Sequence, residues 1–296
     1  MISKGNFLLM GPSEFKGWLD KQKITRSIDK LQVHHTALPN YSTRQIVNGV
    51  AKQDVWKCLE GMRMFHLSQG WSGTGQNITV LEDGHIAISL DRDLNKTPAG
   101  IKGANTGALC IEIIGNFDRG GDTMTLTQKQ AVFHLYACLA LKLNIPIDTS
   151  HIVYHAWYTS SGAWLGDYVK DKSSKTCPGS NFMGDGNTKA AAERNFIPGI
   201  KAEMQCIMNG GDDSMTTKED KAFEELQATV KQQTETIKKL EQHNCMPEIP
   251  SWAVKACEAA KAAGIVDTTA KRSYDFYSLL TVLHRAGMLI TQDKSN

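Results

Sequence analysis

The pattern of hydrophobic and polar positions first indicates a β-strand near residue 31. In this segment Leu31, Val33 and His35 fall on one face of an extended chain, while Gln32 and His34 fall on the other. Leu31 and Val33 are typical core residues, so their face is expected to be buried. It follows that only one of the two adjacent histidines can point into a site.

Three further segments have strand patterns. Residues 78–88 are predicted to form a hairpin, because two apolar runs flank Asp83-Gly84, a dipeptide that favours a tight turn. Residues 108–117 are almost wholly apolar and predict a buried strand, and residues 152–154 predict a short one.

Apolar residues recur at helical spacing in three other segments. These predict helices over residues 13–29, capped by Ser13, over residues 43–67, and over residues 127–143, capped by Thr127. Strands alternating with helices indicate an α/β domain with a mixed central β-sheet flanked by helices. We expect this domain to cover residues 1–208.

The remainder of the chain has a different character. Gly210-Gly211 begins a linker, expected over residues 209–246, in which apolar residues recur at heptad spacing. These residues are Phe223, Leu226, Val230, Ile237 and Leu240. They predict either a short coiled coil or a solvated spacer helix. Residues 247–296 are predicted to form a small α-helical domain. A homodimer would form through residues 223–240 or through this domain.

Composition narrows the possible functions. The 296 residues are 41% hydrophobic and carry a net charge of +2, which does not favour nucleic-acid binding by bulk charge. The N-terminal apolar patch is too short for a signal peptide, and no segment is long enough to span a membrane, so we expect neither secretion nor membrane insertion. The seven cysteines are irregularly spaced and include no CxxC pair, which favours free thiols in a reducing compartment.

Three distant residues form a candidate zinc site: His34, His155 and Cys177. Two histidines and one cysteine are a usual ligand set for a catalytic zinc, in which water takes the fourth position. His34 lies opposite the core face of its strand, and His155 follows a strand, where sites in α/β sheets are commonly built. A lone histidine is more often a satisfied core residue, and His151 competes with His155. Cys177 lies in a polar loop, which suits a thiolate better than a buried structural thiol.

Two more residues are candidates for catalysis. Glu112 interrupts an apolar strand, where a carboxylate is costly unless it is paired or near a metal. Burial would raise its pKa toward the range of a general base, whereas the alternative is a strand-edge glutamate facing water. Lys175 precedes Cys177 by two residues and would point to the same side, where it could stabilise an oxyanion; the alternative is a solvated lysine.

With these residues in view, residues 28–182 resemble the zinc-dependent N-acetylmuramoyl-L-alanine amidase family, which includes the peptidoglycan recognition proteins and many phage endolysins. The order and spacing of the matching segments carry the resemblance. These segments are Val33–Ala37, Gly70–Asn77, Glu82–Gly84, Asn105–Ala108, Gly115–Phe117, His155 and Lys175–Gly179. The C-terminal residues are more weakly similar to small helical modules that end many phage lysins of Gram-positive hosts, which implies that residues 247–296 serve in cell-wall binding or oligomerisation.

The resemblance implies hydrolysis of the amide between N-acetylmuramic acid and L-alanine of bacterial peptidoglycan. It implies one zinc held by His34, His155 and Cys177, a water activated by that zinc, Glu112 as general base and Lys175 at the oxyanion. Two departures are evident. Gln76 stands where some members carry a catalytic tyrosine, and Gly100 stands where many carry a histidine.

The same comparison suggests residues that contact substrate. We take as candidates His35, Gln76, Asn77, Asn105 and Trp157. Trp157 belongs to an aromatic-rich loop, over residues 157–168, that either stacks on sugar rings or forms a loop core. The stem-peptide variant that the groove prefers is left open by the sequence.

Two alternatives to a lytic amidase remain open: a peptidoglycan-binding module without activity, and a zinc hydrolase acting on another amide. The retained zinc ligands together with Glu112 and Lys175 favour the enzyme. A chain without a signal peptide would suit an endolysin that is made in the host cytoplasm and then acts on the cell wall.

Overall fold

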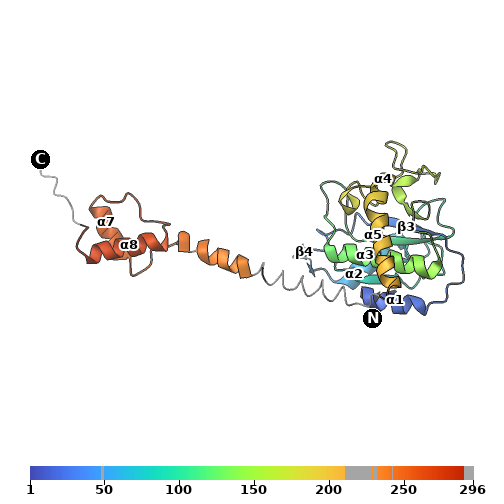
Figure 1. Ribbon diagram of the computed structural model, residues 1–296, viewed down its shortest axis with the longest axis horizontal. Helices are drawn as coiled ribbons and strands as arrows, with labels where there is room; N and C mark the ends of the chain where they lie inside the picture. The colour runs from blue at the N-terminus through green and yellow to red at the C-terminus, as the bar shows by residue number, and fades with distance from the viewer. Residues whose placement is uncertain (48–49, 211–228, 230–231, 242, 290–296) are drawn as a thin grey trace. The chain divides into compact units, whose positions relative to one another are not determined.

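The computed structural model describes residues 1–47, 50–210, 229, 232–241 and 243–289 (Figure 1). The chain divides into two compact units, residues 1–212 and 213–296. Each unit has its own hydrophobic core, so each is described by itself.

A mixed sheet of seven strands forms the centre of the first unit, as the sequence predicts. The strand order is β1-β2-β7-β6-β8-β3-β9. β3 pairs in parallel with β8 and with β9, and β6 pairs in parallel with β8. The pairs β1–β2, β2–β7 and β7–β6 are antiparallel. The strands are β1 (Ile2–Lys4), β2 (Phe7–Met10), β3 (Lys30–His35), β6 (Ile78–Val80), β7 (Ile86–Ser89), β8 (Ala108–Ile113) and β9 (Ile152–Tyr154). A separate hairpin pairs β4 (Ile46–Val47) with β5 (Val50–Ala51).

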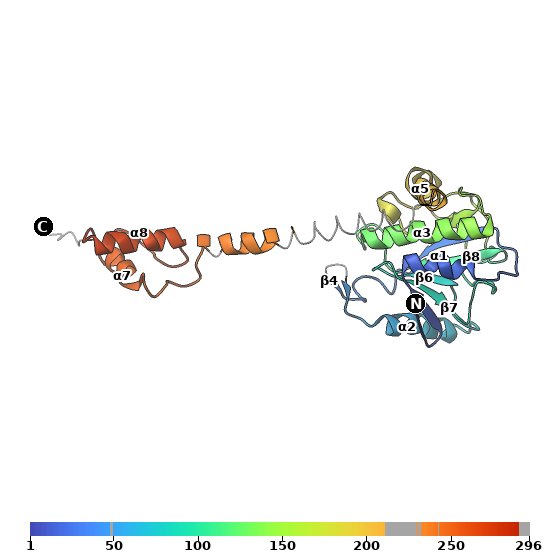
Figure 2. The same ribbon diagram turned by 60° about the horizontal axis from the view of Figure 1, so that its bottom comes forward.

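Helices cover both faces of this sheet (Figure 2). α1 (Pro12–Asp20) and α3 (Leu126–Leu143) lie on one face, α5 (Ile197–Met208) packs outside α3, and α2 (Val55–Ser68) lies on the opposite face. Four short turns complete the unit. They are η1 (His155–Trp157), η2 (Phe182–Gly184), α4 (Lys189–Ala191) and the π-helical η3 (Ala192–Phe196).

The register of the two central strands determines where the polar residues lie. β3 and β8 pair in parallel, with Gln32 opposite Cys110 and His34 opposite Glu112. Because side chains alternate along a strand, these four residues share one face. Their neighbours Leu31, Val33, Leu109 and Ile111 point the other way, into the core that contains α3. The chemically active residues therefore face the α2 side of the sheet.

Several predicted boundaries are wrong. The helix predicted over residues 13–29 begins at Pro12, with Gly11 as N-cap in place of Ser13, and ends at Asp20. Beyond it residues 21–29 form no helix, and the Thr25 amide donates to the side chain of Asn95 instead of to a helical carbonyl. α3 is capped by Thr125, whose hydroxyl accepts from the Gln128 amide, and not by Thr127.

The helix predicted over residues 43–67 begins only at Val55, where the Asp54 side chain caps it. The preceding residues form the β4–β5 hairpin because Arg44 is pulled into the interior, where tertiary contacts override helical periodicity. Strands β1 and β2 were not predicted. Phe7 and Leu9 pack against α2 and Met10 packs on the α3 side, so this short apolar segment completes both cores.

In the second unit, α7 (Val254–Ala262) packs against α8 (Tyr274–Arg285). Their core includes Ala256, Cys257, Ala260 and Tyr277. Residues 232–241 are helical and expose Ile237 and Leu240. The other heptad positions, Phe223, Leu226 and Val230, lie outside the described residues. Within the described part of the chain, no helix has the length and apolar character needed to cross a bilayer.

A buried ion pair connects the loop before α2 to the β6–β7 turn. The Arg44 side chain, 2% exposed, lies 2.7 Å from the carboxylate of Glu82, which is fully buried. The same guanidinium donates to the carbonyl of Gln53. These contacts tie Arg44 to the β6–β7 turn and Gln53 to Arg44.

We expect Arg44→Met to lower the free energy of unfolding by about 3–5 kcal/mol, because it leaves the Glu82 carboxylate buried without a partner. Urea unfolding measures this loss. The double variant Arg44→Met/Glu82→Gln should recover much of the stability, since the stranded charge is removed as well. If the double variant instead loses as much free energy of unfolding as the two single variants together, this interpretation is wrong.

Candidate functional site

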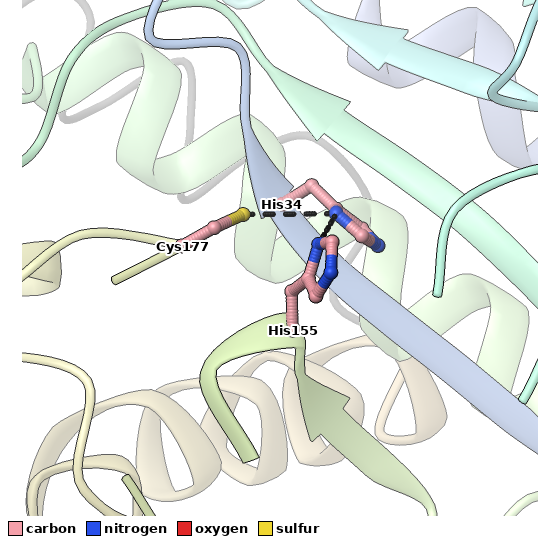
Figure 3. Close-up of side chains that lie close together, drawn as sticks. All are labelled: His34, His155 and Cys177. Carbon is pink, nitrogen blue, oxygen red and sulfur yellow. Dashed lines mark hydrogen bonds between the residues drawn. The ribbon is translucent and has the colours of Figure 1, made fainter. Parts of the chain in front are cut away.

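The three predicted zinc ligands come together at the carboxyl ends of parallel strands (Figure 3). His34 lies near the end of β3, His155 directly follows β9, and Cys177 reaches the site from a loop. Nδ1 of His34 lies 3.3 Å from Nδ1 of His155 and 3.6 Å from Sγ of Cys177. The three ligand atoms lie within 4.8 Å of one another, close enough to hold one ion.

Backbone hydrogen bonds hold the Cys177 loop in place. The Ala156 amide donates to the carbonyl of Cys177, and the His35 amide donates to its Sγ. The carboxylate of Asp118 accepts from the hydroxyl of Thr176 and from the amide of Ser180. The loop is therefore tied to both histidine-bearing strands.

The protonation states of these groups suit a metal. Burial, the neighbouring His155 and the charge of Lys175 lower the pKa of His34 well below its usual value. Burial and Lys175 lower the pKa of His155 to about 4. Both imidazoles are thus neutral and have a lone pair to offer. Burial raises the pKa of the Cys177 thiol, which would lose its proton when a cation binds. Two neutral imidazoles and a thiol that ionises on binding fit zinc.

Glu112 lies beside this cluster. Its Oε1 is 3.9 Å from Nδ1 of His34, while its Oε2 is buried without a hydrogen-bond partner among the described residues. Burial raises the pKa of Glu112 to about 8, although the positive charge of Lys175 opposes this. A carboxyl group of this kind in a cleft is a candidate general base.

A second set of residues, His34, Cys110 and Glu112, also comes close enough to bind an ion. Cys110 is packed beneath the backbone of Gly100, where an added Cβ would lie 2.8 Å from its Sγ. Cys177 and His155 both line the open groove, whereas Cys110 does not. His34, His155 and Cys177 are therefore the better candidate set for a metal ion.

The cluster forms the floor of a groove of about 850 Å³. Residues from α2 and the loops around it form an apolar wall. Phe65 is 62% exposed and Trp71 39% exposed, and the Trp71 ring stacks on His66 with centroids 4.8 Å apart. Lys57, Asp118 and Lys175 add charge to the lining. The sequence pattern does not indicate this wall, because the exposure of Phe65 and the stacking of Trp71 on His66 are evident only in the folded chain.

The predicted substrate residues are placed in different ways. His35 and Gln76 line the groove. Asn77 is buried, and its side chain donates to three backbone carbonyls and accepts from the amide of Cys110. Asn105 accepts from the amides of Gly100 and Ile101. Trp157 is fully buried and donates to the carbonyl of Asn187, so it belongs to the loop core. Neither asparagine nor Trp157 lines the groove.

Two imidazoles, a thiol and an unpaired carboxyl on the floor of an open groove define a candidate hydrolytic metal centre. The family model described as N-acetylmuramoyl-L-alanine amidase (Amidase_2) matches residues 24–180, more than half of the chain, and the chain belongs to this family. Among curated proteins, no sequence matches significantly.

Solved structures similar to this chain include two from Clostridium intestinale. The N-acetylmuramoyl-L-alanine amidase LysC is 21% identical and has a TM-score of 0.38, with 58% of this chain and 89% of that chain covered. The endolysin amidase LysCS is 22% identical with a TM-score of 0.37, covering 57% and 84%. A mutant of Drosophila PGRP-LB in complex with tracheal cytotoxin is 20% identical with a TM-score of 0.41, covering 58% and 83%.

We expect one zinc ion per chain, and chelation of that zinc should lower the melting temperature, because the folded state binds the ion and the unfolded state does not. Cys177→Ala should lose the zinc, whereas Cys110→Ala should retain it. Metal analysis after dialysis measures both. The opposite result, with zinc lost only from Cys110→Ala, would move the site to the second set of residues.

Proposed function

We propose that this chain is an N-acetylmuramoyl-L-alanine amidase that cleaves the amide between the lactyl group of N-acetylmuramic acid and L-alanine in bacterial peptidoglycan. The observation that supports this most strongly is the unpaired Glu112 carboxyl beside the His34, His155 and Cys177 cluster, in a chain of the amidase family. This cluster lies in a groove of about 850 Å³.

Each residue has a chemical role in this proposal. His34, His155 and Cys177 would hold the zinc, which when bound would supply a water molecule of lowered pKa and polarisation of the scissile carbonyl. Glu112, within 4 Å of the ligand cluster, accepts a proton from the attacking water and passes it to the amine that leaves. Lys175 lines the groove and places positive charge where the carbonyl oxygen becomes negative.

The pKa of about 8 belongs to Glu112 without metal. A dication bound nearby favours the ionised carboxylate, which is the form that a base requires. A noncatalytic peptidoglycan-binding module would not need an unpaired carboxyl at this place, so we favour the enzyme.

We further propose that the chain acts as a phage endolysin, held in the host cytoplasm before lysis, with its second unit binding the cell wall. Two aromatic side chains support wall binding: Trp252 is 43% exposed and Tyr274 42% exposed, with ring centroids 5.5 Å apart. Exposed aromatic rings in contact offer a face on which sugar rings can stack. The exposed Ile237 and Leu240 support a homodimer through the helical segment.

We expect Glu112→Gln to keep its zinc and to release new L-alanine amino termini from purified cell wall at least about a hundredfold more slowly, because the amide cannot accept the proton. Amino-group labelling of the digested wall measures this release. Glu193→Gln, an equivalent change at an exposed glutamate, should leave both zinc and activity unchanged.

The outcomes separate the hypotheses. A wild-type protein that binds zinc and wall but releases no amino termini is a binding module. Full activity in Glu112→Gln would remove Glu112 from its role as base while leaving the amidase proposal intact.

We expect Trp252→Ala in the full chain to reduce cosedimentation with purified cell wall, while hydrolysis of a soluble muramoyl peptide is unchanged. Leu279→Ala, at another exposed position of the same unit, should bind the wall like the wild type. If Trp252→Ala cosediments as the wild type does, the aromatic pair is not the wall-binding face.

A further inference from the structure

A polar side chain with no role so far lies directly beneath the metal site. Gln32 is fully buried, two residues before His34 and on the same face of β3. A buried amide is costly unless its donors and acceptor are all satisfied. The partners of Gln32 are therefore informative.

The neighbouring loop determines how this amide is oriented. Oδ1 of Asn105 accepts from the amides of Gly100 and Ile101, each at 2.9 Å, so the atom at that position must be oxygen. The Gln32 side chain presents one end to this oxygen, at 3.4 Å, and to the carbonyl of Ala104, at 2.8 Å. An end that faces two acceptors must be the NH2 group, Nε2. The opposite end of the amide is therefore the oxygen, Oε1.

This oxygen faces His34. Oε1 of Gln32 lies 3.3 Å from Nε2 of His34, so Nε2 must carry the proton and donate it. The neutral ring then has its lone pair on Nδ1, the atom that faces Cys177 and His155. Within the described residues, Gln32 is the hydrogen-bond partner found for Nε2 of His34.

We propose that Gln32 is a positioning residue that fixes the tautomer and the ring orientation of His34, so that Nδ1 is presented to the metal. A histidine that binds a metal typically donates the N–H of its other ring nitrogen to such a partner, which fixes the tautomer and the orientation of the ring. The role rests on the proposed metal centre and extends it. It also connects residues 100–105 to the site, because that loop holds the amide of Gln32 in place.

Gly100 is part of the same arrangement. A Cβ at this residue would lie 2.2 Å from Oε1 of Gln32. A side chain there would push the oxygen out of line with Nε2 of His34. Glycine at position 100 thus leaves space for the Gln32 amide to reach the ring.

Two substitutions at Gln32 separate its functions. Gln32→Met has a similar volume but no acceptor, and we expect its zinc affinity to fall about 10–100-fold. Gln32→Glu keeps an acceptor for Nε2 of His34 but cannot donate to Ala104 unless it is protonated, and it should keep most of the affinity. Competition with a chromophoric zinc chelator measures each affinity in the full chain.

Gln128→Met is the matched control. Gln128 is also fully buried, and its amide donates to the carbonyls of Val80 and Ile114, but it does not line the groove. It should lose stability without losing zinc affinity. If the absence of a buried amide were enough to lower zinc affinity, Gln32→Met and Gln128→Met would lose it equally.

The tautomer gives a second readout that needs neither activity nor metal. Long-range nitrogen–proton NMR of the zinc-free wild type should show His34 protonated on Nε2, and Gln32→Met should show a mixture of tautomers. A wild type protonated on Nδ1, or a Gln32→Met variant that retains wild-type zinc affinity, would overturn the proposal. If Gln32→Met does not fold, the wild-type tautomer and the Gln32→Glu affinity decide it. Zinc binding without amide hydrolysis would refute the proposed function and leave the role of Gln32 standing.

Discussion

The parallel pairing of β3 with both β8 and β9 is the constraint on which the site depends. Pairing with β8 sets His34 opposite Glu112, and pairing with β9 brings the strand that ends at His155 alongside. Side chains alternate with a period of two, so a slip of one residue in β3 would turn His34 into the core. The apolar face of the strands, buried against α3, prevents such a slip. Hydrophobic packing on one side of the sheet thus determines the geometry of polar residues on the other.

Burial has opposite effects on the groups in this site. It keeps the imidazoles of His34 and His155 neutral, as a metal requires, and it holds the Cys177 thiol and the Glu112 carboxyl protonated until a cation arrives. The Arg44–Glu82 pair holds the segment before α2, from which Thr43 and Gln53 line the groove, against the β6–β7 turn.

Local sequence patterns were sufficient to predict the mixed sheet, and they singled out the three residues that the structure brings together in the candidate metal site. The alternation in residues 31–35 correctly separated His34 from Leu31 and Val33, and Glu112 was evident as a carboxylate in an apolar strand. The same alternation placed Gln32 beside His34, yet its role could be recognised only once the loop at Asn105 was in place.

The failures lie where distant contacts override local pattern. Residues 43–54 have helical periodicity, but Arg44 pairs with a residue 38 positions away. Trp157 lies in a polar loop, but its ring is buried because Asn187 supplies a partner for its indole. The wall formed by Phe65 and Trp71 arises from the packing of a helix against a loop, which periodicity alone does not describe.

The ligands of the site are far apart along the chain. His34 is separated from His155 by 121 positions and from Cys177 by 143. No local folding unit can contain them, and contacts at such separation form only after a large loss of chain entropy. The candidate metal site is therefore complete only when β3 is aligned with β9. An ion bound there would close a loop through most of the first unit. Because the seven cysteines are free, such an ion would be a reversible crosslink in a chain without disulfides.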